Sequence, residues 1–136
     1  MCIAIYKPAD KIIDKATLER CFNANPDGAG FMYTNGVEMK IHKGFFTFKS
    51  FWKAFEPHKD RQCLIHFRIK THGEVSVKNC HPFFITKDIG FIHNGIISKH
   101  GGNKEVSDTR DFNEKVLRPL VKQFGTTITV SYTHLT

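Results

Sequence analysis

The second residue of the chain is a cysteine, and its position gives it more chemistry than its type alone. Cys2 follows the initiator Met1 directly. Because cysteine is a small residue, we expect aminopeptidases to remove the methionine before it, which would leave a thiol and a free α-amine on one residue. Such a pair can serve as a nucleophile that carries its own base. The mature N-terminus is therefore a candidate catalytic centre.

A second group of chemically useful residues lies in the middle of the chain. The stretch HFRIKTHGEVSVKNCHPF (66–83) holds an arginine, a threonine and three histidines, and FIHNGII (91–97) follows it after a short turn. Polar residues gathered where strands end are more typical of a site than of a core. Two of them have a simpler interpretation: His66, between apolar neighbours, is expected to be a hydrogen-bonded sheet residue, and Asn94-Gly95 alone is typical of a hairpin turn.

The histidines and cysteines do not predict a metal site. The spacing of His72, His81 and His93 matches none of the usual ligand patterns, so we expect neither a metal nor a cofactor. The chain has four cysteines without a CxxC pair, which favours reduced thiols. They are Cys2, Cys21, Cys63 and Cys80.

Taken together, these segments follow one order along the chain. After Cys2 and NPDGAGFMY (25–33) come R-x-x-T-H-G (68–73), N-x-H-P (79–82), H-N-G (93–95) and S-D-T (107–109). This order resembles the class II glutamine amidotransferases, whose glutaminase domain begins with a cysteine and is an N-terminal nucleophile hydrolase. The resemblance covers residues 2 to 124.

The resemblance implies a reaction with L-glutamine. The Cys2 thiolate would attack the side-chain amide, ammonia would leave, and water would hydrolyse the γ-glutamyl thioester. The negative charge that develops on the amide oxygen would be stabilised by the Asn94 side chain and the Gly95 backbone N–H, which the resemblance assigns as oxyanion-hole donors.

The resemblance also implies a substrate-binding set. A carboxylate is well matched by the planar guanidinium of an arginine, and Arg68 with the Thr71 hydroxyl would bind the α-carboxylate of glutamine. Asp108 would bind its α-ammonium group. His72 would shape the loop over the pocket, with His81 in a turn beside it.

Two other interpretations stay open. The chain could be an N-terminal-cysteine amidase that acts on another γ-glutamyl amide. It could also be a non-enzymatic basic binding module, since the formal charge is +7 and the pI about 9.3. However, lysines and arginines are scattered and never form a block of five or six, so we do not expect a nucleic-acid partner.

The sequence also bears on membrane contact, on location and on an acceptor for the ammonia. No apolar run reaches the roughly 18 residues that span a bilayer, and the N-terminus lacks the layout of a secretory signal. We therefore expect a cytoplasmic protein without membrane contact. No acceptor-using synthase domain is present, so the acceptor for the ammonia would have to come from the missing C-terminus or from a separate synthase or acceptor-binding partner.

The first half of the chain predicts alternating strands and helices. An apolar run at 2–6 predicts a central strand. Asp14 is expected to cap a helix that ends before Pro26. Asn35-Gly36 between strand-like runs predicts a hairpin with a type I′ turn. Thr47 is expected to cap a second helix, with phenylalanines and a tryptophan on one face.

The second half predicts two more strands and a final helix. The strands are RQCLIHFRI (61–69) and DIGFIHNGII (88–97). The helix is expected to begin at Ser107, to be kinked or interrupted by Pro119, and to end with Gly125 as its C-cap.

These elements give an α+β fold class. The resemblance narrows it to the N-terminal nucleophile hydrolase sandwich, in which stacked antiparallel sheets are flanked by helices, here incomplete at its C-terminus. Residues 1–129 would form the truncated glutaminase-type domain. Residues 130–136 (VSYTHLT) resemble the translation of a DNA adapter used in sequencing, although an ordinary terminal strand is the alternative.

Overall fold

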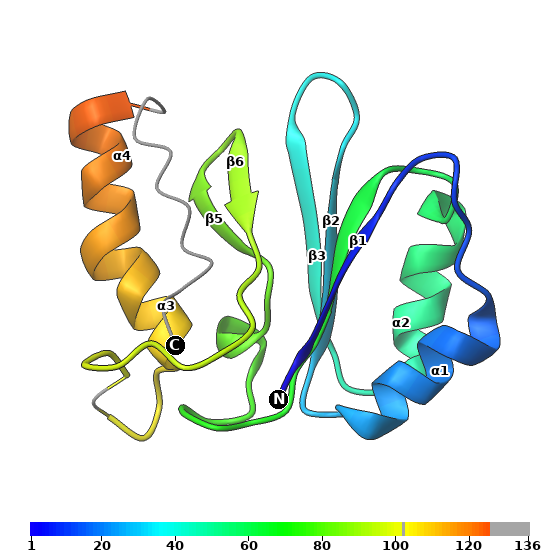
Figure 1. Cartoon of the computed structure of the whole chain (residues 1–136), viewed down its shortest axis with the longest axis horizontal. Coiled ribbons are helices and arrows are strands. Elements are labelled where there is room, and N and C mark those ends of the chain that lie inside the picture. Colours follow the sequence, from blue (N-terminus) through cyan, green and yellow to red (C-terminus); the bar gives the residue numbers. More distant parts are fainter. Residues whose placement is uncertain (102, 126–136) are drawn as a thin grey trace.

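The structure, a computed structural model, describes residues 1–101 and 103–125. This part of the chain is an α+β fold whose helices and antiparallel sheets lie in four successive layers (Figure 1). One outer layer contains α1 (Lys15–Ala24) and α2 (Phe48–Phe55). The other outer layer is the helical segment that follows Ser107, and the two sheets lie between these layers.

The larger sheet has four antiparallel strands in the order β1-β4-β2-β3. Their bounds are Ile3–Lys7 for β1, Ala29–Thr34 for β2, Met39–Phe45 for β3 and Cys63–Phe67 for β4. The prediction of a central N-terminal strand was wrong, because β1 pairs only with β4 in the described sheet. Ile3 and Ile5 pack against the core while Ala4 and Tyr6 are exposed, which is the period-two pattern of a half-buried edge strand.

The hairpin between β2 and β3 is confirmed, but its turn is shifted by one residue. Asn35 N donates to Glu38 O at 3.3 Å, so the two central positions are Gly36 and Val37. Gly36 has φ +90°, which glycine adopts without strain. The Asn35 side-chain oxygen accepts from the backbone N–H groups of Val37 and Glu38, so asparagine closes the turn from its flank.

Helices α1 and α2 begin where the sequence predicts. The Asp14 side chain accepts from Thr17 N at 2.8 Å, and the Thr47 side chain accepts from Ser50 N at 3.2 Å, which satisfies one free N–H group at each helix start. Both helices pack against one face of the larger sheet and bury an aromatic core there. Its buried members are Leu18, Phe22, Ala29, Phe31, Tyr33, Phe51, Phe55, Cys63, Ile65 and Phe67.

The smaller sheet is a hairpin of β5 (Phe83–Thr86) and β6 (Ile89–Phe91). The predicted strand over 88–97 is therefore mostly wrong, and β5 was not predicted as a separate strand. Beyond Phe91, side chains replace a neighbouring strand as backbone partners: His66 Nε2 contacts His93 O, and the Asp108 carboxylate accepts from Ile97 N. The backbone there has no strand ladder to join.

The final helical segment begins and ends as predicted. Ser107 caps α3 (Asp108–Phe112) by accepting from Arg110 N, and Gly125 follows α4 (Arg118–Phe124) with φ +68°. Between them, Asn113–Leu117 forms a wider π-helical turn. Because Pro119 has no N–H to give to the preceding turn, the irregular turn before it agrees with the predicted interruption.

Two further expectations can be compared with the described residues. All four cysteines are free thiols, as the sequence predicts. None of the described helices combines the length and apolar character needed to cross a membrane. Residues 130–136 lie outside the described part of the chain.

Candidate active site

The thiol of Cys2 lies against the residues that follow β4. Its Sγ accepts from Ile69 N at 3.4 Å and is 3.5 Å from Ile69 O, and the side chain is half-buried. The register of the sheet explains this contact, because Ile3 pairs with Phe67 at the end of β4. Strand pairing thus brings the N-terminus to the loop that begins with Arg68.

Asn25, at the C-cap of α1, holds the peptide group that joins Met1 to Cys2. Its side-chain nitrogen donates to Met1 O at 2.7 Å and to Phe67 O at 3.4 Å, and the residue is only 6% exposed. Sequence analysis did not single out Asn25 as a site residue. The sequence feature that could have indicated it is the position of Asn25 at the start of NPDG, immediately before a strand.

Arg68 is buried and organises the loop after β4. Its guanidinium donates to His72 O at 2.7 Å and to Glu74 O at 2.9 Å. Its backbone N–H donates to Gly28 O, and its carbonyl accepts from Asp27 N, both at 2.9 Å. Arginine therefore fixes the curve of the loop on which Thr71 is exposed and His72 half-buried.

Asn79 joins this loop to the S-D-T segment. Its side chain donates to Glu74 O and Glu105 O and accepts from Ser107 N, at 3.0, 2.6 and 3.0 Å. Gly73 lies at the same junction with φ +75°, and a Cβ there would come within 2.5 Å of Ser107 N. The glycine is required because the two segments approach so closely.

Asp108 and Thr109 hold the segment that contains Asn94 and Gly95. The buried Asp108 carboxylate accepts from Ile97 N at 2.6 Å and from Thr109 N at 2.8 Å. The Thr109 hydroxyl is 3.1 Å from His93 Nδ1. Asn94 is exposed, and its side chain has no hydrogen-bond partner among the described residues.

A continuous series of hydrogen bonds connects the segments that contain the predicted site residues. It runs from Cys2 to the loop after β4, through Arg68 and Asn79 to Ser107, and from Asp108 to the segment around Ile97. The structure therefore connects Cys2 with the segments around Arg68, Asn79, Asp108 and Ile97. A shared glutamine pocket around them stays a prediction.

Two histidines lie in the interior next to this network. His66 Nε2 is 3.1 Å from His93 O, which confirms His66 as a hydrogen-bonded sheet residue. The ring centres of His66 and His81 are 3.9 Å apart. Burial lowers the pKa of His66 to about 3 and that of His81 well below its ordinary value, so both are neutral at pH 7. His81 does form a bend, but its side chain packs inside rather than beside a loop.

Comparison with known proteins gives short similarities to one kind of enzyme. No family model matches the chain. A segment of 43 residues is 44% identical to glutamine–fructose-6-phosphate aminotransferase (isomerizing) of Shewanella oneidensis, which covers 32% of this chain and 7% of that protein. A segment of 52 residues is 38% identical to the enzyme of the same name from Pseudomonas syringae pv. tomato, which covers 38% of this chain and 8% of that protein.

Proposed function

We propose that this chain is a glutaminase-type unit that hydrolyses the side-chain amide of L-glutamine with Cys2 as nucleophile. The observation that carries the proposal is the contact of the Cys2 thiol with Ile69, the residue directly after buried Arg68. The short similarities to two aminotransferases named for glutamine support the same substrate.

Removal of Met1 would free the amine that activates the thiol. The amine of Cys2 would take the thiol proton and later pass it to the departing ammonia. Asn25 Nδ2 donates to Met1 O, an oxygen that leaves with Met1, so hydrolysis would leave the Asn25 amide without this acceptor and next to the new amine of Cys2. Water would then hydrolyse the thioester and release glutamate.

Asn94 and Gly95 are the proposed oxyanion-hole donors. The Asn94 amide has no other partner among the described residues, so it is free to donate to a developing negative charge. Gly95 has φ +142°, a backbone conformation that a side chain would oppose. One such donor typically lowers the barrier by roughly 3 to 4 kcal/mol.

Arg68, Thr71, His72 and Asp108 are the proposed substrate-binding residues. A guanidinium has five N–H donors, and the described hydrogen bonds of Arg68 use only two nitrogens. The others, with the exposed Thr71 hydroxyl, would bind the α-carboxylate. Each oxygen of Asp108 already accepts a backbone N–H, and the carboxylate has further lone pairs for the α-ammonium group.

The proposal is tested by glutamate release from L-glutamine. Cys2→Ala should abolish it, because nucleophile and base reside on one residue. Cys21→Ala is the matched control: Cys21 is also a half-buried free thiol, and its loss should leave the rate unchanged. Equal activity of the Cys2→Ala variant and the wild type would reject the proposal.

The proposed roles predict different kinetic changes. Asn94→Ala should lower kcat by about 10² to 10³, as expected for one oxyanion-hole donor. Arg68→Ala and Asp108→Ala should mainly raise KM, because these contacts hold the substrate in both ground and transition states. Thr71→Ala should also raise KM, and it should disturb the fold least of the four substitutions, since Thr71 is exposed. Equal loss of kcat with unchanged KM in all four variants would refute the assignments.

The ammonia would pass to an acceptor bound by a separate synthase or partner protein in the cytoplasm. An amidase acting on another γ-glutamyl amide would need the same Cys2. Substrate comparison, with glutamine against γ-glutamyl amides of larger amines, separates the two: we expect glutamine to have the highest kcat/KM.

A further inference from the structure

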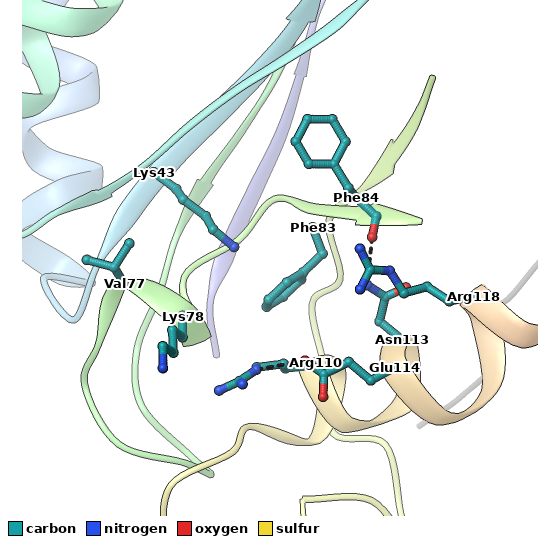
Figure 2. Close-up of a pocket in the computed structure, with 9 residues that line it drawn as sticks. All are labelled: Lys43, Val77, Lys78, Phe83, Phe84, Arg110, Asn113, Glu114 and Arg118. Atoms are coloured by element: carbon teal, nitrogen blue, oxygen red, sulfur yellow. Dashed lines mark hydrogen bonds and ion pairs between the residues drawn. The ribbon is translucent and has the colours of Figure 1, made fainter. Parts of the chain in front are cut away.

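A groove beside β5 contains none of the residues proposed to bind or cleave glutamine. Its volume is about 410 Å³, within the range of small-ligand sites. It lies between the end of β3, the turn before β5, β5 itself and the final helical segment (Figure 2). The lining residues used below are Lys43, Lys78, Phe83, Arg110, Asn113 and Arg118.

The groove has a clear excess of positive charge. Four cationic side chains are arranged around the Phe83 ring, against a single carboxylate, that of Glu114 (Figure 2). Arg110 pairs with Glu114 at 3.1 Å. Lys78 and Arg118 are exposed and have no ion-pair partner in the described part of the chain. The groove thus offers two cations, Lys78 and Arg118, whose charge no carboxylate of the described residues neutralises.

Lys43 is held at the inner end of the groove. Its Nζ donates to Cys80 O at 3.0 Å and lies 4.3 Å from the centre of the Phe83 ring. Burial lowers its pKa, and the positive charge of Arg110 adds to that effect. An anion bound between these two cations would relieve their repulsion.

Asn113 provides an independent sign of a ligand. The residue is only 3% exposed, and its side-chain nitrogen donates to Phe84 O at 2.9 Å. Its side-chain oxygen is buried and has no hydrogen-bond partner. A buried acceptor without a partner is costly, so a group that donates a hydrogen bond is expected there.

We propose that this groove binds a small phosphomonoester that carries a hydroxyl group beside its phosphate. Lysine and arginine would bind the phosphate by charge-assisted hydrogen bonds, and the hydroxyl would donate to the Asn113 oxygen. The ring of Phe83 would form the apolar floor under the carbon skeleton.

Calorimetric titration of the full 136-residue chain at fixed ionic strength tests this proposal. Glycerol 3-phosphate should bind about tenfold more tightly than methyl phosphate, because only the former has the hydroxyl for Asn113. Glycerol should not bind. Equal affinity of the two phosphates, or no binding of glycerol 3-phosphate, would overturn the proposal.

Variants separate a built site from general charge. Arg118→Gln and Lys78→Gln, both at exposed positions, should each weaken glycerol 3-phosphate binding by about tenfold. Lys53→Gln is the control: it removes one positive charge from an exposed position on α2, in the opposite outer layer, and should leave the affinity for glycerol 3-phosphate unchanged. Similar weakening by all three, or binding of an oligonucleotide but not of glycerol 3-phosphate, would show only a basic surface. Cys2→Ala should bind like wild type, so this test is independent of the proposed glutaminase reaction.

Discussion

The two faces of the four-stranded sheet are held by different forces. On the helix side, Phe31, Phe51 and Phe67 are fully buried, and the rings of Phe51 and Phe67 lie 5.2 Å apart. On the other side, the same strand β4 presents His66, and Arg68 follows directly after it. The first face is stabilised by apolar burial, and the second by polar side chains that bind backbone groups.

This difference separates what builds the fold from what arranges the candidate site. Along β4 and the residue after it, the order Ile65, His66, Phe67, Arg68 alternates between the two faces. The apolar residues fix the strand on its helices, while the polar residues hold segments that have no strand ladder of their own. Gly30 on β2 pairs with His66. A Cβ at Gly30 would collide with the carbonyl oxygen of His81, so the strand approaches the segment around His81 closely there.

The largest effect is expected on the helix side. Phe51→Ala should lower the free energy of unfolding by about 3 to 5 kcal/mol, because it leaves a cavity among packed rings. Urea unfolding measures it. Phe46→Ala, at a residue that is 41% exposed, is the control and should cost much less. Equal costs for the two would show that the aromatic face is not a packed core.

On the polar side, Arg68→Met should cost about 2 to 3 kcal/mol, since two loop carbonyls lose a charged donor. The same unfolding experiment applies. Arg20→Met removes an exposed arginine from α1 and should change stability by no more than about 0.5 kcal/mol. If both substitutions are neutral, the guanidinium does not hold the loop.

Acid should weaken the polar face through His66. At pH 7 His66 is neutral in both the folded and the unfolded chain. As the pH falls below the unfolded pKa of about 6.5, only the unfolded chain gains the proton, because burial lowers the folded pKa to about 3. His66 should therefore cost about 2 kcal/mol of stability between pH 7 and pH 5. In urea titrations, His66→Gln should flatten this dependence; an identical slope in both proteins would contradict it.

The smallest effect is expected from the end of the chain. Because residues 130–136 are expected to be a translated adapter sequence, deleting them should change the free energy of unfolding by no more than about 0.5 kcal/mol. A large loss of stability on deletion would favour an ordinary terminal strand instead.

The aromatic side of the fold could be predicted from sequence because its signals are local. Asp14 and Thr47 cap their helices, and the phenylalanines recur at helical spacing. The polar side depends on contacts between distant segments, such as Asn79 with Ser107, and no periodicity encodes them. For the same reason the motif order predicted candidate residues, while the place of Asn25 and the end of β6 at Phe91 required the structure.

The central claim is that Cys2 becomes the N-terminus and forms a covalent intermediate with glutamine. Mass spectrometry of acid-quenched protein during turnover tests it most directly, because one spectrum of the N-terminal peptide reports both processing and acylation. We expect a peptide that begins at Cys2, without Met1, and that carries a γ-glutamyl group only when glutamine is present. Fully active protein that retains Met1, or acylation at Cys21 instead, would contradict the mechanism.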